Sequence, residues 1–288
     1  MNLCDYNTIR DLLARHGFHF SKSMGQNFLI DPEVPRRIAE ASGADAGCGV
    51  LEIGPGIGPL TAELAQRAGK VVAVELDRAL LPVLAETMAP YPNVEIVPGD
   101  VLKLDLTTIA AEKFQGLTPM VCANLPYNVT SPILEKLVES PCFTAFTVMI
   151  QREVARRLCA PQGSSEGGSF SLFLQYYMEP ELLFDVPPEK FLPAPKVTSA
   201  VIRCVRRDRP AVEVADEGFF FHVMRGGFLL RRKTLANSLS AALPEISKEV
   251  IQQAIADVGL PAAVRGEQLT LEDFAALSAA LGREADGD

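Results

Sequence analysis

The chain has 288 residues, of which 48% are hydrophobic and 22% charged, and its formal net charge is −9. These values are typical of a soluble globular protein with one large and one small domain, and no window approaches the roughly 20 apolar residues of a membrane span. The acidic total argues against a polyanion-binding surface over the whole molecule, although a local basic face can still bind phosphates. Six scattered cysteines without a C-x-x-C pair, and only three histidines, predict reduced thiols of a cytoplasmic protein and argue against a metal site.

The amino-terminal segment predicts an amphipathic helix within residues 5–20, followed by a loop rich in Gly, Ser and Asn at 21–32. It carries acids and no apolar core, so we expect no secretory signal. In the loop, Asn27 stands beside Phe28 and Leu29. Amide and apolar side chains together suit a lid over a partly apolar ligand, and they fit a loop that docks on the core equally well.

A glycine-rich turn, EIGPGIG, follows an apolar strand at 50–53 and precedes a helix at 59–68. The next strand, 71–75, ends in Glu75. Glycines let the backbone approach a ligand closely, and an acid at the second strand end accepts hydrogen bonds from a ribose diol. A dinucleotide fingerprint requires a glycine where Pro59 stands, so the turn favours a cofactor without a pyrophosphate, such as S-adenosylmethionine. The glycines of the turn are Gly54, Gly56 and Gly58.

A third strand, predicted at 94–97, is followed by Asp100. A carboxylate at this strand end could accept a hydrogen bond from the amino group of an adenine ring. The same aspartate could instead cap a helix that follows it.

A fourth apolar strand, at 120–123, ends at the tetrapeptide Asn-Leu-Pro-Tyr. Because proline lacks an N–H and restricts its neighbour, we expect a stiff loop at the carboxyl end of the strand, where α/β sheets hold their ligands. An amide, a carbonyl and an aromatic ring would be presented there together, ready to bind an exocyclic amine and stack on a flat heterocycle. A turn with a packing tyrosine is the alternative. The four residues are Asn124, Leu125, Pro126 and Tyr127.

The following segments predict a fifth strand at 143–150 and a helix at 151–158 that carries three arginines, Arg152, Arg156 and Arg157. Residues 170–177 fit a strand or a helix. Prolines after 186 then force an extended loop around Phe191, and a strand over 196–205 closes the sheet. Phe191 forms either a stiff wall for an aromatic ligand or part of the core.

From about residue 210 the pattern changes to helices, at 216–228, 231–242, 247–257 and 270–281. We therefore predict two domains: 1–209, with amino-terminal helices and a cofactor lid loop at 1–47, and a small helical domain at 210–288. A basic run without acids, Arg231, Arg232 and Lys233, suits phosphate binding or a solvated helix face.

The chain resembles the KsgA/RsmA family of ribosomal RNA small-subunit adenine N6,N6-dimethyltransferases in eight segments that occur in family order. These are SMGQNFLIDP, LEIGPGIGPLT, VVAVELD, GD at 99–100, ANLPYNVTSPI, MIQREVARRL, VPPEKFLPAPKVTSAVIR and RRKTLANSL. The resemblance implies a Rossmann-like class I methyltransferase domain with a mostly parallel sheet, a small carboxy-terminal all-α domain for RNA docking, and S-adenosyl-L-methionine as methyl donor. The implied substrate is N6 of two adjacent adenosines in a 3′-terminal hairpin loop of 16S rRNA, within an immature small ribosomal subunit. A cytoplasmic monomer is expected.

The same resemblance implies roles for individual residues. Asn27 and Leu29 would line the cofactor, and the three glycines of the turn would approach it by backbone. Glu75 would hold the ribose hydroxyls, and Asp100 the adenine. Asn124 would lie where cofactor and target base meet, with the Leu125 or Pro126 carbonyl as a second acceptor. An aromatic pair, Tyr127 and Phe191, would stack on the flipped adenine.

Three other functions compete with this interpretation. Erm-type enzymes, which methylate adenine N6 in 23S rRNA, share the glycine turn and the Asn-Leu/Ile-Pro-Tyr motif. A non-catalytic ribosome-assembly factor could keep the fold, although it would be expected to lose the cofactor residues. A small-molecule methyltransferase is disfavoured by the separate helical domain and the basic run.

Overall fold

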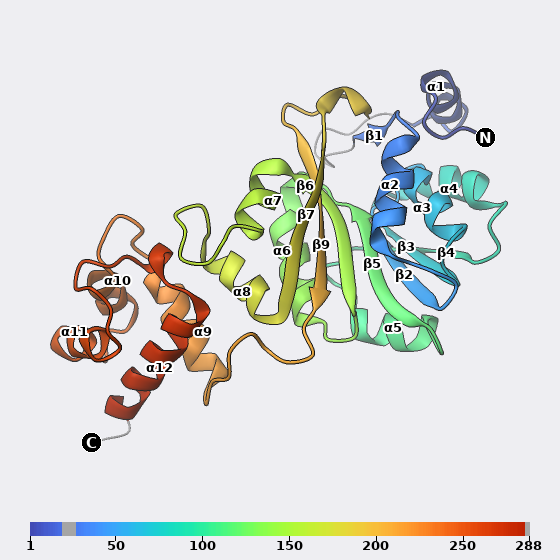
Figure 1. The fold of residues 1–288 in the computed structure, drawn as a ribbon. Helices are drawn as coiled ribbons and strands as arrows, with labels where there is room; N and C mark the ends of the chain where they lie inside the picture. The colour runs from blue at the N-terminus through green and yellow to red at the C-terminus, as the bar shows by residue number, and fades with distance from the viewer. Residues whose placement is uncertain (19–26, 286–288) are drawn as a thin grey trace. The chain divides into compact units, whose positions relative to one another are not determined.

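The computed structural model describes residues 1–18 and 27–285. They form two compact units (Figure 1): Met1–Ala155 with Pro180–Arg206, and Arg156–Glu179 with the described residues from Arg207 onward. The second unit therefore begins its last segment at Arg207, close to the domain boundary expected at 209–210. It also includes an earlier segment, Arg156–Glu179, that the prediction assigned to the first domain. The functional division into 1–209 and 210–288 stays a prediction.

The first unit is built on a seven-stranded sheet with the order β4-β3-β2-β5-β6-β9-β7. Strands β2 to β6 run parallel, and β9 pairs antiparallel with β6. The sheet confirms the predicted Rossmann-like class. Its strands are β2 (Cys48–Ile53), β3 (Lys70–Glu75), β4 (Val94–Pro98), β5 (Thr118–Asn124), β6 (Ala145–Gln151), β7 (Met178–Val186) and β9 (Ser199–Arg206).

Burial on both faces explains why the central strands are continuous apolar runs rather than alternating ones. Every residue of β2 is buried. On one face, Val50 and Val71 share a buried cluster with Ile38 of α2 and Leu64 of α3. On the other, the Phe114 ring at the end of α5 lies against Gly49.

Three helices of this part of the chain were predicted, within 5–20, at 59–68 and at 151–158, and the first two end earlier than expected. The helix expected within 5–20 ends at Arg15, followed by Gly17 with φ 63°, and the one expected at 59–68 ends at Ala65. The helices are α1 (Tyr6–Arg15), α2 (Glu33–Ser42), α3 (Pro59–Ala65), α4 (Leu81–Met88), α5 (Leu106–Lys113) and α6 (Thr130–Glu139), with 3₁₀ turns η2 (Arg78–Leu80), η3 (Tyr127–Val129) and η4 (Pro188–Lys190). Helix α7 (Arg152–Leu158) contains the boundary between the two units, after Ala155.

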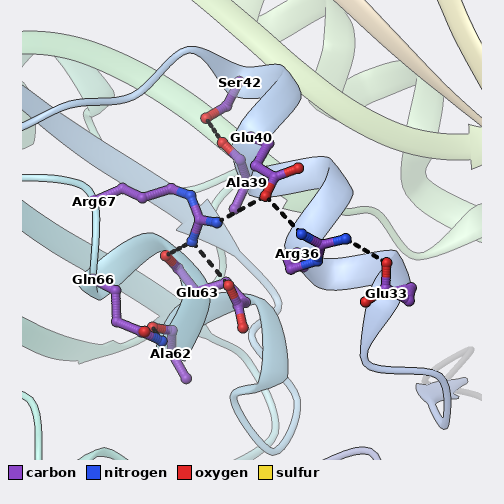
Figure 2. A network of polar contacts seen from close by, with 9 residues as sticks. All are labelled: Glu33, Arg36, Ala39, Glu40, Ser42, Ala62, Glu63, Gln66 and Arg67. Carbon is purple, nitrogen blue, oxygen red and sulfur yellow. Dashed lines mark hydrogen bonds and ion pairs between the residues drawn. The ribbon is translucent and has the colours of Figure 1, made fainter.

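An ionic network joins α2 to α3 (Figure 2). Arg67, just after α3, donates to Glu63 at 2.8 Å and to Glu40 of α2 at 3.3 Å. Arg36 pairs with Glu40 and with Glu33 on α2 itself. Exposed ion pairs contribute little individually, but this network links the helix that follows the glycine turn to its neighbour.

A two-stranded ribbon, absent from the sequence-based prediction, pairs β1 (Phe28–Leu29) with β8 (Phe191–Leu192). The pairing is antiparallel and places Leu29 opposite Phe191. Two further contacts extend it: the Ile30 N–H donates to the Lys190 carbonyl at 2.9 Å, and the Lys190 ammonium lies 2.6 Å from Asp31. We call this the β1–β8 ribbon.

The second unit is helical, and the segment left open at 170–177 is a helix. Aromatic rings of α8 and α9 pack together, with centroids 5.0 Å apart for Tyr176 and Phe221 and 5.3 Å for Tyr176 and Phe220. Within the described residues, no helix has the length and apolar content to cross a membrane. The helices are α8 (Ser169–Tyr177), α9 (Glu217–Gly227), α10 (Leu235–Ala242), α11 (Lys248–Asp257) and α12 (Leu271–Ala285), with the 3₁₀ turn η5 (Gly266–Gln268).

Candidate active site

A cavity of about 290 Å³ opens in the first unit at the carboxyl ends of β2, β3, β4 and β5. This is the edge at which an open α/β sheet binds its ligands. Asn27 to Leu29 and the glycine turn contribute to its wall, as do the residues after the four strands. Ten of the predicted site residues line it: Asn27, Leu29, Gly54, Gly56, Glu75, Asp100, Asn124, Leu125, Pro126 and Tyr127.

The glycine turn contributes backbone to the cavity wall because its conformation favours residues without side chains. Gly54 and Gly56 have φ values of 68° and 63°. The Phe28 ring lies 3.2 Å from where a Cβ of Gly56 would be, so the β1–β8 ribbon packs closely on the turn. Gly58 precedes α3 and does not line the cavity; a Cβ there would meet the Met88 side chain at 2.5 Å. A direct contact between Gly58 and a ligand remains a prediction.

Glu75 is held in one orientation at the end of β3. Its side chain is buried, and it accepts hydrogen bonds from the Asp77 N–H at 2.8 Å and the Gly56 N–H at 3.2 Å. Burial raises the pKa of the Glu75 carboxyl, and these two backbone donors oppose that rise. The carboxylate thus connects the second strand to the glycine turn and still borders the cavity.

Glu52, the first residue of the EIGPGIG motif, is a second carboxyl group in the wall and was not among the predicted site residues. It is 1% exposed, and its Oε2 has no hydrogen-bond partner among the described residues. Burial raises the pKa of Glu52 to about 8. Charge at that position within an otherwise apolar strand was the signal that could have identified it.

Asp100 supplies the third carboxyl group, half-buried after β4. It does not cap a helix, as the alternative interpretation had it: its Oδ1 accepts from the Leu102 N–H at 3.0 Å within a turn. Asp105 caps α5 instead. Asp100 is therefore available to the cavity that it lines.

The Asn-Leu-Pro-Tyr loop is fixed by hydrogen bonds from both ends. The Leu125 N–H donates to the Met149 carbonyl at 3.1 Å, while the Pro126 carbonyl accepts from the Thr130 hydroxyl at 3.1 Å. Thr130 is the first residue of α6. The Tyr127 hydroxyl bonds to Ser199 Oγ of β9, and burial raises the pKa of the phenol.

Phe191 packs in the core in this structure, the second of its two predicted possibilities. It is 3% exposed, belongs to the buried cluster of Leu29, Met149 and Val201, and does not line the cavity. Its predicted contact with a target base remains a prediction. Residues 21–26 of the predicted lid loop lie outside the described residues.

The ionisable side chains that line the cavity are acidic. Its described lining carries Glu52, Glu75 and Asp100 and no lysine, arginine or histidine. No group of three His, Cys, Asp or Glu side chains among the described residues is arranged to hold a metal ion. Such a lining suits a ligand with positive groups and disfavours a diphosphate, which requires cationic or N–H donors.

Comparison with known proteins identifies the family. The model of the family "Ribosomal RNA adenine dimethylase" matches residues 17–277. The chain belongs to the ribosomal RNA adenine dimethylase family. It is 49% identical over 279 residues to the ribosomal RNA small subunit methyltransferase A of Bacillus mycoides (strain KBAB4), covering 96% of both chains, and equally to that of Bacillus cereus (strain AH187). The predicted family and enzyme class are thereby confirmed.

Two solved structures resemble this chain in fold. The 23S rRNA methyltransferase ErmE is 28% identical, with a TM-score of 0.67 over 89% of this chain and 100% of that one. A dimethyladenosine transferase from Plasmodium falciparum is 23% identical, with a TM-score of 0.74 over 90% of this chain and 98% of that one, and supports the fold alone.

In a ribosomal RNA adenine dimethylase, exposed basic side chains are candidates for RNA contact. In the first unit Arg152 is half-exposed and lies 3.4 Å from Asp185. In the second unit Arg156 and Arg157 are exposed on α7.

The basic run of the second unit is not helical. The helix predicted at 231–242 begins only at Leu235, because Leu230 to Lys233 form a turn in which the Lys233 N–H donates to the Leu230 carbonyl at 2.8 Å. Arg232 and Lys233 are exposed, and Arg231 lies 3.8 Å from Glu267. The prediction of a helix over these residues was wrong, whereas their role in RNA binding remains a prediction.

Proposed function

We propose that this chain transfers methyl groups from S-adenosyl-L-methionine to N6 of two adjacent adenosines in a 3′-terminal hairpin loop of 16S rRNA, giving N6,N6-dimethyladenosine during maturation of the small subunit. One observation carries the proposal. The acidic cavity and the fixed Asn-Leu-Pro-Tyr loop meet at one sheet edge, in a chain 49% identical to proteins named ribosomal RNA small subunit methyltransferase A.

The residues present fit this cofactor. The unpartnered, buried Glu52 oxygen and a lining without basic side chains favour a ligand with positive groups, and S-adenosylmethionine has two. Glu75 can accept from a ribose diol and Asp100 from an adenine amine. When bound, this cofactor supplies a sulfonium methyl group that a nitrogen nucleophile accepts as the carbon–sulfur bond breaks.

The Asn-Leu-Pro-Tyr loop is suited to activating the target amine. The lone pair of an adenine amine is delocalised into the ring, and hydrogen bonds from its N–H groups to two acceptors favour a more tetrahedral, nucleophilic nitrogen. Asn124 supplies one oxygen. The Pro126 carbonyl already accepts from Thr130 and from the Val129 N–H at 3.3 Å, so the Leu125 carbonyl is the better second acceptor. Positioning and electrostatics then supply most of the catalysis.

Tyr127 is the aromatic platform that borders the cavity. Its hydroxyl bond to Ser199 restricts the ring, and a restricted ring costs less conformational entropy when a base stacks on it. The target adenine must leave its own stack, at a cost of a few kcal/mol that is smallest in a loop. Arg152, Arg156, Arg157 and the basic run would hold the surrounding phosphates, within a monomer acting in the cytoplasm on an immature small subunit.

The test is methylation of ribosomal subunits from a strain that lacks the modification, followed by nuclease digestion and mass analysis of the adenosines. We expect two dimethylated adenosines in 16S rRNA and none in 23S rRNA. Absence of product on small subunits, despite cofactor binding, would contradict the proposal.

An Erm-type activity is the second candidate, because the similarity to the 23S rRNA methyltransferase ErmE covers all of that chain. Primer extension on both ribosomal RNAs from a deletion strain separates the two activities. Loss of modification confined to 23S rRNA would favour the Erm-type enzyme. A non-catalytic assembly factor would be indicated if calorimetry detected no binding of S-adenosylmethionine.

A further inference from the structure

Two consecutive leucines, Leu229 and Leu230, are exposed immediately before the basic run of the second unit. Leu229 is 56% exposed and Leu230 38%, and in the described part of the chain no other two consecutive large apolar residues are exposed. Single exposed apolar residues are ordinary on a protein surface, whereas an adjacent pair leaves a continuous apolar area in water that a partner can cover. Residues 229–233, which we call the exposed turn, therefore combine two apolar side chains with three cations.

The backbone of the exposed turn is held at its leucine end by Ser238 of α10. The buried Ser238 hydroxyl donates to the Gly226 carbonyl of α9 at 2.7 Å and accepts from the Leu230 N–H at 2.9 Å. The Leu229 N–H also donates to the Gly226 carbonyl, at 3.2 Å. Both leucines thus have bound N–H groups, so their exposure is set by hydrogen bonds to neighbouring helices.

The interior next to the exposed turn is already filled. Phe228, the residue before the leucines, is half-buried, and its ring centroid lies 6.0 Å from that of Phe274 on α12. A Cβ added to Gly227 would meet the same Phe274 ring at 2.9 Å, so a larger side chain has no space there. The two leucines are therefore left on the surface, where a partner can reach them.

The charges around the leucines indicate the chemistry of that partner. Residues 225–233 contain four basic side chains and no acidic one, in a chain whose net charge is −9. Among the described residues, Arg231 is the one cation of the exposed turn with a carboxylate nearby, Glu267 at 3.8 Å. A second copy of this chain would bring like charges together, which is unfavourable, whereas a polyanion complements them.

We propose that Leu229 and Leu230 contact an unpaired base of the ribosomal RNA while the basic run binds the phosphates beside it, an inference that rests on the proposed RNA substrate. A paired RNA helix presents phosphates, 2′-hydroxyls and base edges, and its base faces are covered by stacking. An unstacked base in a loop, a bulge or an end offers an apolar face that two leucines can cover. Neither leucine lines the cavity, so this base is not the one that is methylated.

Such a contact gives the second unit a selectivity that its charge does not supply. Contacts to phosphates position a protein on RNA without distinguishing one sequence or structure from another. An apolar contact to an unpaired base adds affinity only where the RNA departs from a regular helix. The exposed turn would therefore favour irregular segments of the small-subunit RNA over paired ones.

Binding of the full chain to unmethylated small ribosomal subunits, measured at several salt concentrations, tests the contact. Changing Leu229→Gln and Leu230→Gln together removes apolar area and no charge. The affinity should fall by about 5- to 30-fold at every salt concentration, because covering the exposed part of two leucines contributes about this much. The slope of log affinity against log salt should equal that of the wild type, because the same number of counterions is released.

The matched control changes Leu182→Gln and Val205→Gln, at two apolar positions of the first unit that are 39% and 38% exposed and lie outside the cavity. It removes a comparable apolar area and should leave the affinity for small subunits unchanged. Melting temperatures show whether each variant is folded. If the double leucine variant is unstable, Leu229→Gln alone, at the more exposed position, decides.

Chemical probing of the bound subunits, with reagents that modify unpaired bases, identifies the contact directly. The wild type should protect an unpaired nucleotide that becomes reactive again when saturating amounts of the double leucine variant are bound instead. Protection of the remaining nucleotides should be the same for both proteins, since the basic run is unchanged.

The outcomes are distinct. Unchanged affinity of the leucine variant, or an equal loss in the control, would overturn the proposed contact. Weaker binding with every base protection retained would also overturn it, and would indicate a ribosomal protein as the partner of the leucines. Failure of the wild type to bind or methylate small subunits would instead overturn the proposed function itself.

Discussion

The cavity of the first unit and the basic run of the second are both candidate ligand surfaces, yet they are built in opposite ways. The cavity is formed by residues with fixed partners: Glu75 is held by two backbone N–H groups and Leu125 by Met149. The basic run is a turn whose Arg232 and Lys233 are exposed. The first is organised before a ligand arrives, and the second offers charge with little fixed geometry.

This difference separates two kinds of recognition. A transfer reaction requires reacting atoms within a few tenths of an ångström, and buried hydrogen bonds supply that accuracy. RNA phosphates are numerous and similar, so exposed basic side chains are sufficient to bind them without a fixed geometry. Substitutions in the cavity should therefore affect chemistry steeply, whereas those in the basic run should affect affinity gradually and in a salt-dependent way.

The largest effect is expected for Asn124→Ala. Removing an acceptor that acts on the target amine should lower the methyl-transfer rate by about 100- to 1,000-fold, with S-adenosylmethionine affinity changed only a few-fold. Transfer of labelled methyl to unmodified small subunits measures the first quantity, and calorimetry the second. The matched control is Asn7→Ala, an exposed asparagine on α1 outside the cavity lining, which should lose far less. Near-normal turnover of Asn124→Ala would remove the role assigned to it.

An intermediate effect is expected when Arg231, Arg232 and Lys233 are all changed to Gln. RNA affinity should fall, and the dependence of log affinity on log salt should become less steep by about 0.7 to 1 per residue, because fewer counterions are released. Filter binding to small-subunit RNA at several salt concentrations provides the measurement. Calorimetry should show unchanged S-adenosylmethionine affinity.

The control for this prediction is a triple neutralisation of exposed basic residues in the first unit, Arg10, Arg15 and Lys103, which are 57–83% exposed. It changes the net charge equally. An equal loss of RNA affinity in the control would show that the basic run acts only through the net charge of the protein.

The smallest effect concerns the β1–β8 ribbon. Lys190 donates a hydrogen bond to Asp31 that holds the pKa of that carboxyl below its usual range, so the pair adds stability above the pKa of an unfolded aspartate, about 3.9, and loses it as pH falls further. Lys190→Ala should lower the urea midpoint slightly at neutral pH and not at all in strong acid. Lys196→Ala, another exposed lysine nearby, should lack this pH dependence. A difference that persisted in acid would attribute the effect to packing.

The parts of the site that sequence could predict are those that follow from strand periodicity. Strand ends in a parallel sheet meet at one edge, so Glu75, Asp100 and Asn124 could be brought together before any coordinates existed. The charge of Glu52 within an apolar strand marked it as unusual, but only the packing shows that its Oε2 lacks a partner among the described residues. The β1–β8 ribbon could not be predicted from the sequence, because two-residue strands show no periodicity and their pairing joins segments that are distant in the chain.

The β1–β8 ribbon also determines how much of the chain must be synthesised before the cavity is complete. Leu29 lines the cavity, but its strand partner, Phe191, comes after six strands of the sheet. Contacts so distant in sequence form late, since closing the intervening loop is entropically costly until the sheet has condensed. A nascent chain released only as far as β6 would hold the glycine turn and Glu75 without this wall. Synthesis must proceed through β8 before the wall of the cavity can be completed.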